Sequence, residues 1–343
     1  MKLLGYSLCW FLAANSYLAW GELYYPYSYG EFVELDHNIS LAPPARPSGP
    51  PFDSVVTKYG PAVVTEGFFE AQSTIIPWSS YWYPKSEKVL FDETTSPGTS
   101  TLGRYDKYVA KRGSGSLGSA REYEEKNLYS SQNASWEGLC DALAMAAIME
   151  KEPVREVTLK GVNFRIQDLK ALLIKSYEGS FYKNIYGQRN NAAWDSVYED
   201  VYPEQFHRFI QAEIFEKKVP FIMDMDAGYQ IWNVPVYKIQ TKIVKDAADP
   251  ELVHVKTWVH FASPFVNDLN YVGTLDTTKS YSYDLHGKVL ENGGFLVDYG
   301  VWTENSRWDH PDYLVARPES SERKVKNIKL DISIIDEIVK TSQ

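Results

Sequence analysis

The sequence predicts an α+β fold, and two observations on hydrophobic patterning predict it. After residue 120, apolar residues first recur at the three- and four-residue spacing of helices, whereas beyond residue 218 they alternate with polar residues as in strands. Elements that segregate along the chain in this way, helices first and strands after, are typical of α+β domains. We therefore expect one α+β domain over residues 121–320.

Three helices are expected in the first half of this domain. The first covers residues 136–150 and ends before Pro153, because proline cannot continue a helix. The second covers residues 166–177. The third starts at Pro203, a residue type favoured at the first helical position, and continues to residue 218.

The second half of the domain should form an antiparallel sheet. Cys140 lies in the first of the helices that precede it. A Cys-bearing helix packed on an antiparallel sheet is the layout of papain-like enzymes, so we expect a papain-like core. The predicted strands are short apolar or alternating segments at residues 219–223, 234–244, 253–261, 280–285 and 295–302.

Residues 1–21 are predicted to be a secretory signal peptide. Lys2 precedes the largely apolar stretch 3–18, and Ala19 and Gly21 supply small residues for a cleavage site. An uncleaved membrane anchor is the alternative, although no later segment is apolar enough to span a membrane. We expect a secreted, extracellular protein that makes no membrane contact after cleavage.

Two further features bear on the environment and the partners of the protein. Glycosylation sequons at Asn38 and Asn133 agree with a secreted glycoprotein. The net charge of -10 argues against a nucleic-acid partner, because no excess of basic side chains is available to neutralise phosphates.

Residues 22–120 are expected to form an irregular N-terminal region. They are rich in proline, contain an aromatic patch at residues 78–83, and predict only short strands, at 62–65 and 88–90. The dibasic pair Lys111-Arg112 precedes a Gly/Ser stretch. Two interpretations follow: a pro-region removed by proteolysis, or a linker between permanent domains. Residues 321–343 are expected to form a C-terminal tail or helix.

Cysteine usage identifies the candidate nucleophile. Of the two cysteines, Cys9 lies within the predicted signal peptide, which leaves Cys140 alone, as either a reactive thiol or a buried bystander. Cys140 lies early in its helix, where free backbone amides stabilise a thiolate and can donate to an oxyanion. Gly138 would let a substrate backbone approach closely. These features favour the nucleophile.

A thiol nucleophile requires a base, and two histidines are candidates. His207 lies beside the apolar helical position Phe206, at the edge of a face expected to be buried, and His310 follows the last strand. Asp224 or Asp226 could orient such a histidine, although the simpler interpretation is two exposed turn carboxylates. The sequence contains no EF-hand, zinc, P-loop or dinucleotide motif.

Several segments in a fixed order resemble the elicitor-type transglutaminase family of Phytophthora and its bacterial relatives. The resemblance extends over residues 121–318, and its most specific part is the segment Ile231-Trp232-Asn233-Val234-Pro235-Val236, which is similar to the family's signature peptide. The other matching segments are 136–140 with the following helix, 157–164, 168–173, 206–207, the strand ending at Asp224, and 302–314.

The resemblance implies a protein-glutamine γ-glutamyltransferase that crosslinks Gln and Lys side chains of protein substrates through a Cys140 thioester. It implies His207 as the general base and Asp224 near it. It also implies a dependence on calcium, for which the sequence shows no nameable ligand set. Further positions expected to bind the oxyanion or the substrate are Trp136, Gly138, Trp232 and Asn233.

The chain departs from the family pattern at two positions. Asp141 stands where the family has histidine after the nucleophile, and its negative charge would oppose thiolate formation. Val234 replaces a glutamine of the signature peptide. Two alternatives therefore stay open: a secreted papain-like cysteine peptidase or amidase, and a catalytically inactive binding or recognition module of the same fold.

Overall fold

The computed structural model describes residues 54–343, apart from 95, 97, 114–116, 189–200, 226 and 321. These residues belong to one compact unit, which spans 41–343. The predicted signal peptide, the Asn38 sequon, most of the Gly/Ser stretch and Asp226 lie outside the described residues. None of the helices in the described part of the chain is both long enough and apolar enough to cross a membrane.

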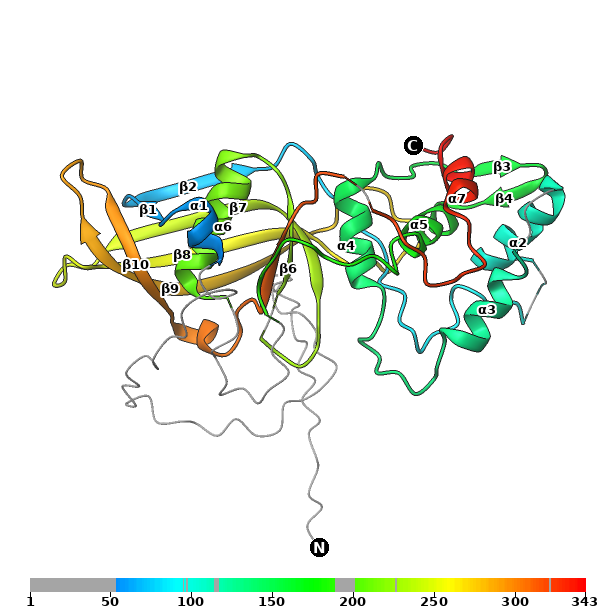
Figure 1. Cartoon of the computed structure of the whole chain (residues 1–343), viewed down its shortest axis with the longest axis horizontal. Helices are drawn as coiled ribbons and strands as arrows, with labels where there is room; N and C mark the ends of the chain where they lie inside the picture. The colour runs from blue at the N-terminus through cyan, green and yellow to red at the C-terminus, as the bar shows by residue number, and fades with distance from the viewer. Residues whose placement is uncertain are drawn as a thin grey trace, which may run out of the picture. The chain divides into compact units, whose positions relative to one another are not determined.

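The protein mixes helices with a curled, fully antiparallel sheet (Figure 1). Its strands follow the order β1-β10-β9-β8-β7-β6-β11-β5, and β2 joins the sheet by pairing with β7. The strands are β1 (Val63–Val64), β2 (Gly67–Gln72), β5 (Ile185–Gly187), β6 (Phe221–Asp224), β7 (Asn233–Lys245), β8 (Leu252–Ala262), β9 (Asp276–Val289), β10 (Phe295–Trp302) and β11 (Tyr313–Ala316).

The long strand β7 connects two parts of the unit. One of its edges pairs with β8, whereas its other edge is shared by two short strands. β6 pairs with the first residues of β7, so that Asp224 lies opposite Asn233, and β2 pairs with the later residues, so that Gly67 lies opposite Ile243. Groups at the start of β7 and groups at its far end therefore belong to different surroundings.

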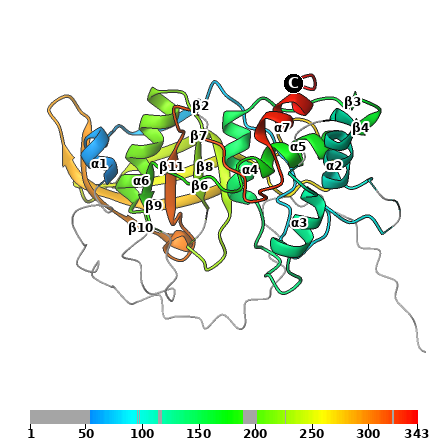
Figure 2. The same ribbon diagram turned by 45° about the vertical axis from the view of Figure 1, so that its right-hand side comes forward.

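The helices pack in two places. In Figures 1 and 2, α4 lies between the sheet and α5, and it contacts both β7 and α5. α6 and the π-helical turn Gln211–Glu216 cover the sheet elsewhere, with contacts to β7, β9 and β10. The helices are α1 (Ser54–Tyr59), α2 (Thr101–Arg112), α3 (Ala120–Asn127), α4 (Cys140–Met149), α5 (Ile166–Lys175), α6 (Pro203–Ile210) and α7 (Ile332–Val339), with a 3-10 turn at Glu304–Arg307 and a separate hairpin of β3 (Val157–Leu159) and β4 (Val162–Phe164).

The sequence of α4 explains its central position. Alanine is its commonest residue, and all of its residues from Ala142 to Ile148 are buried. Small side chains let the helix approach its neighbours closely and carry a low entropic cost in a helix. The helix ends at Glu150, whose extended backbone leads into Pro153. The main hydrophobic core lies around this helix and includes side chains of α2, α5, α7, β6 and β11.

Most of the predicted elements of residues 121–320 are present. The three expected helices correspond to α4, α5, and α6 with its π-helical turn, and the five expected strands to β6 through β10. Residues 54–120 contain more regular structure than the sequence predicts. The missed helix α2 begins after Ser100, whose side chain accepts from Gly103 N–H, and ends at Gly113 with φ 83. No strand forms at 88–90, which is a turn.

Candidate active site

Cys140 is the first residue of α4, and its sulfur is surrounded by backbone groups. The side chain is 6% exposed. Its thiol donates to the carbonyl oxygen of Ile231 at 3.6 Å, and the backbone amides of Asp141 and Asn233 donate toward the sulfur. The amides at a helix start carry partial positive charge and favour a thiolate. The sulfur is thus held between the first turn of α4 and the segment that leads into β7.

Two carboxylates disfavour the thiolate form of Cys140, whereas the backbone amides favour it. Burial and, after it, the negative charges of Asp141 and Asp224 together raise the pKa of the Cys140 thiol to about 12, against the lowering effect of the two amides. Asp224, fully buried at the end of β6, accepts the Trp232 backbone N–H at 2.8 Å. Burial also raises the pKa of Asp141. The thiol is therefore protonated at neutral pH.

Two tyrosines hold the polar groups around Cys140. The Tyr313 hydroxyl, on β11, donates to Asn233 Oδ1 at 2.8 Å. The Tyr182 hydroxyl donates to the Asp141 carbonyl oxygen at 3.1 Å. Burial raises the pKa of both phenols, and Cys140 and the two aspartates add to that rise. Both hydroxyls therefore stay protonated and act as donors, which fixes the positions of Asn233 and of the first turn of α4.

An aromatic cluster lies beside the start of α4. The ring of Trp82 meets Trp232 at a centroid distance of 5.8 Å and Phe265 at 5.2 Å. The Trp82 carbonyl oxygen accepts the Leu139 N–H at 2.6 Å. A Cβ atom at Gly138 would lie 2.5 Å from Trp82 Cδ1 and 2.6 Å from that carbonyl oxygen, so only glycine permits this approach.

Trp82 also presents a buried donor with no partner in the described structure. Its Nε1 makes no hydrogen bond, although the atom is inaccessible to solvent. It would lie 3.3 Å from a Cβ at Gly138, two residues from the thiol. Leaving such a donor unpaired costs about 1–3 kcal/mol, so its retention suggests a partner that is bound only during function.

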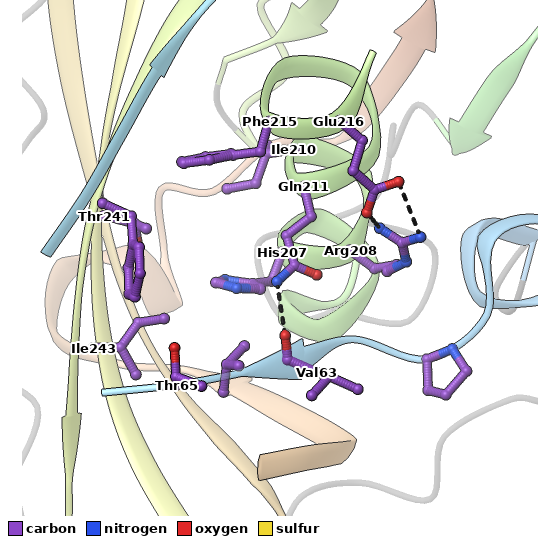
Figure 3. Close-up of a pocket in the computed structure, with 13 residues that line it drawn as sticks. Val63, Thr65, His207, Arg208, Ile210, Gln211, Phe215, Glu216, Thr241 and Ile243 are labelled. Atoms are coloured by element: carbon purple, nitrogen blue, oxygen red, sulfur yellow. Dashed lines mark hydrogen bonds and ion pairs between the residues drawn. The ribbon is translucent and has the colours of Figure 1, made fainter. Parts of the chain in front are cut away.

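His207 does not join this cluster. Its Nδ1 bonds the Tyr283 hydroxyl at 2.7 Å, and the same hydroxyl bonds Thr257, which in turn bonds Thr241. Thr241 follows Asn233 by eight residues on β7, which is roughly 26 Å along an extended strand. Figure 3 shows His207 projecting from α6 toward the part of the sheet that carries Thr241. The expectation that His207 is the base for Cys140 is therefore not supported by the geometry.

None of the contacts described for Cys140 is with an imidazole. The hydrogen-bond partners of Cys140, and the charges that act on it most strongly, come from Ile231, Asn233 and the two aspartates. His310 is buried, stacks on Trp302 at 5.2 Å, and its Nδ1 donates to the Ser306 carbonyl oxygen at 2.8 Å. The side-chain charges that act most strongly on the sulfur are thus those of two carboxylates.

The remaining predicted residues divide between the cluster and its edge. Asp224, Gly138, Trp232 and Asn233 all lie around Cys140, as the preceding contacts show. Trp136 is half-buried and packs edge-on against Tyr229 at 5.7 Å, with no hydrogen bond from its indole. Sequence reasoning missed Trp82 as a site residue, although the aromatic patch at 78–83 was visible.

The expected calcium finds no evident ligand set. Among the described residues, no group of three or more His, Cys, Asp and Glu side chains lies close enough together to hold a metal ion. Calcium prefers six to eight oxygen ligands, with carboxylates among them. The dependence on calcium stays an implication of the family resemblance.

Comparison with known proteins places the chain in a family. A sequence model of the transglutaminase elicitor family matches residues 96–297, which is more than half of the chain. The chain belongs to the transglutaminase elicitor family. The match includes Cys140, the Asp224 strand and the signature-like segment at the start of β7. No curated protein matches this family member.

One solved structure is similar to this family member over most of its length. It is described as the crystal structure of the GP42 transglutaminase from Phytophthora sojae, with a TM-score of 0.63 and 19% sequence identity. The similarity covers 87% of this chain and 98% of the other. At this identity it shows the fold alone, a mixed helix and sheet unit with a curled antiparallel sheet.

Proposed function

We propose that this elicitor-family protein is a secreted protein-glutamine γ-glutamyltransferase that uses Cys140 as its nucleophile. The observation that carries the proposal is the placement of one sulfur at a helix start, with two backbone amides donating toward it and an unpartnered indole N–H nearby. Such donors stabilise the charge that develops during acyl transfer. The packing of α4 against β7 is compatible with a papain-like core, which we retain as an interpretation.

We assign the role of proton acceptor to Asp224 instead of His207. The Asp224 carboxylate is fully buried and acts electrostatically on Cys140. A resting thiol with a pKa of about 12 must lose its proton as it attacks, so the acceptor has to lie in the same cluster. Asp224 is fixed for this task by the Trp232 N–H.

The reaction then follows the chemistry of a thioester. Sγ attacks the carboxamide carbon of a substrate glutamine, and its proton passes to Asp224. The oxyanion accepts hydrogen bonds from a helix-start amide and from Trp82 Nε1, and the collapse of the intermediate releases ammonia, which takes the proton from Asp224. A lysine amine attacks the thioester, loses a proton through Asp224, and leaves an isopeptide bond and a free Cys140 thiol.

Amine incorporation tests the nucleophile directly. The protein is incubated with casein and a labelled primary amine, and the label in casein is measured for the wild type and for Cys140→Ser. We expect incorporation by the wild type and its loss in the variant. Incorporation that survives in Cys140→Ser would contradict the proposal. Release of peptides or ammonia without incorporation of the amine would instead support the peptidase or amidase.

A non-catalytic recognition module is the second candidate, and one observation favours it. The pKa of Cys140 is raised, and Asp141 stands where the family has histidine. The thiol therefore stays protonated in its buried position. A module of this kind would keep the fold and bind a partner without turnover. It is favoured if neither amine incorporation nor hydrolysis is detected while the protein is folded, as judged by cooperative thermal unfolding.

A further inference from the structure

A cavity of about 370 Å³ lies far from Cys140, between α6 and the strands β1, β2 and β7. Figure 3 shows side chains from the helix and from the strands pointing into it. Apolar side chains make up slightly more than half of its walls, with Val63, Phe69, Ile210, Phe215 and Ile243 among them, and the remaining lining residues are polar or charged. Ligand sites in proteins are typically cavities of roughly 300–1,000 Å³ with apolar walls and a few polar groups, and this cavity matches that description.

His207 is one of the polar residues that line this cavity, with Thr65, Arg208, Gln211, Glu216 and Thr241. The His207 side chain is only 1% exposed. Nδ1 is engaged by Tyr283, whereas Nε2 has no hydrogen-bond partner among the described residues. Burial and the nearby Arg208 charge lower the pKa of His207 to about 3, so the ring is neutral. Nε2 is not among the inaccessible atoms that lack a partner, so it is open to a hydrogen bond with a molecule that enters the cavity.

The hydrogen-bond chain behind His207 sets which nitrogen carries the proton. The Tyr283 hydroxyl bonds Nδ1 at 2.7 Å and Thr257 at 2.9 Å, and Thr257 bonds Thr241 at 3.1 Å. A phenol is a better proton donor than a neutral imidazole, so Tyr283 donates to Nδ1 and accepts from Thr257. The ring proton then resides on Nε2. The cavity therefore presents a hydrogen-bond donor.

The charged and amide groups at the rim are occupied within the protein. Arg208 pairs with Glu216 at 2.7 Å and donates to the Tyr59 carbonyl oxygen. Gln211 Nε2 donates to the Val63 carbonyl oxygen at 3.1 Å. Because the Arg208 charge is balanced by Glu216, the cavity offers little compensation for burying an anion, and an uncharged ligand fits it better.

We propose that this cavity binds a small, uncharged, mainly apolar carbonyl compound whose oxygen accepts a hydrogen bond from His207 Nε2–H. The apolar walls take the hydrocarbon part of the ligand, and the His207 donor orients its carbonyl. The site is separate from Cys140 and does not depend on acyl transfer. It gives His207 a binding role in place of the catalytic role suggested by the sequence.

The probe for this site is 6-propionyl-2-dimethylaminonaphthalene, an uncharged aromatic ketone whose fluorescence reports the polarity around its carbonyl group. We expect saturable binding to the full chain with a blue shift from its emission in water. His207→Phe keeps an aromatic ring but removes the donor, and should weaken binding by about tenfold, as expected for one lost hydrogen bond in a buried site. Ile210→Trp should block binding by filling the cavity.

Two controls separate this site from others. Cys140→Ser should bind the probe with wild-type affinity, and the 6-carboxylate analogue of the probe should bind more weakly than the ketone. Nitrogen-15 NMR of the wild type provides a measurement that needs no variant: the His207 Nε2–H resonance should shift at saturation. Absence of saturable binding, equal affinity in His207→Phe, or an unchanged Nε2–H resonance would each overturn the proposal.

Discussion

Cys140 and His207 lie in two polar clusters at different points along β7, and the clusters differ in what surrounds the reactive group. Around Cys140, the neighbours are backbone amides, two carboxylates and two tyrosine hydroxyls, beneath an aromatic cluster. Around His207, one nitrogen is bonded internally and the other faces a cavity whose walls are slightly more than half apolar. The presence of Cys140 and His207 in the sequence therefore does not make them a catalytic pair. The register of the strands and the packing of the helices decide which side chains come into contact.

The largest expected effect concerns the reactivity of the Cys140 thiol. Its pKa of about 12 lies some three units above the ordinary value, so the thiolate fraction near neutral pH falls about a thousandfold. Alkylation of the folded protein by iodoacetamide at pH 7.5 should be slower than that of the unfolded protein in urea by a similar factor. Equal rates in the two states would mean that the sulfur is exposed or ionised.

The next effect concerns Trp82 and tests whether its indole N–H takes part in catalysis near Cys140. Trp82→Phe keeps a ring in the aromatic cluster but removes the unpartnered N–H. If this N–H holds the oxyanion, the rate of amine incorporation should fall by about a hundredfold, in line with the loss of one oxyanion donor. Thermal stability should change little. A matched Trp136→Phe variant should retain activity, because its indole lies at the edge of the site.

Much of the fold follows from local sequence pattern, whereas the site follows from it only in part. The spacing within α4, α5 and α6 and the alternation within β7 to β9 are local signals, and they fix the elements. Asp224 and Trp232 could be placed together because β6 and β7 are consecutive antiparallel strands. The sequence features that predict the missed helix α2 are its capping residues, Ser100 and Gly113, and not a long apolar stripe.

The contacts that could not be predicted are long-range. Trp82 is held against Gly138 by the hydrogen bond from the Leu139 N–H to the Trp82 carbonyl oxygen. Hydrophobic periodicity in the sequence does not predict such a contact. The distance between His207 and Cys140 depends on where α6 packs against β9 and β10. The pro-region hypothesis stays a prediction, and long-range contacts bear on it as well. Cleavage after Arg112 and loss of the preceding residues would remove β1, β2 and α2 from the unit.

A smaller effect concerns the packing at the start of α4. Gly138→Ala would drive a Cβ to 2.6 Å from the Trp82 carbonyl oxygen, so one of the two loops must move. We expect the free energy of unfolding to fall by about 1–3 kcal/mol, as for other overpacked sites. Chemical denaturation measures this change. Glu137→Ala, the neighbouring change with no such contact, serves as the control and should lie close to wild type.

A further effect on stability concerns its pH dependence and belongs to the His207 side. Its folded pKa of about 3 lies below that of an unfolded histidine, so between pH 3 and about 6.5 the unfolded state binds more protons. Stability should therefore fall as the pH drops through this window, by about 1.4 kcal/mol per pH unit from this group.

His207→Gln should remove that part of the slope between pH 4 and 6, measured by denaturation at several pH values. His254→Gln is the matched control, because Asp246 and Asp284 raise the pKa of His254, which is therefore protonated in both states over this range. An unchanged slope in His207→Gln would show that the folded protein takes up a proton at His207, against the buried and neutral ring described here.

The most direct test of the central claim, that Cys140 works with Asp224 and without His207, compares amine incorporation by Asp224→Asn and His207→Gln. Both variants are first checked for cooperative unfolding, and initial rates are measured with casein and a labelled primary amine. We expect that Asp224→Asn loses most of its activity while His207→Gln keeps a rate close to wild type. Loss of activity in His207→Gln, with activity retained in Asp224→Asn, would contradict the central claim.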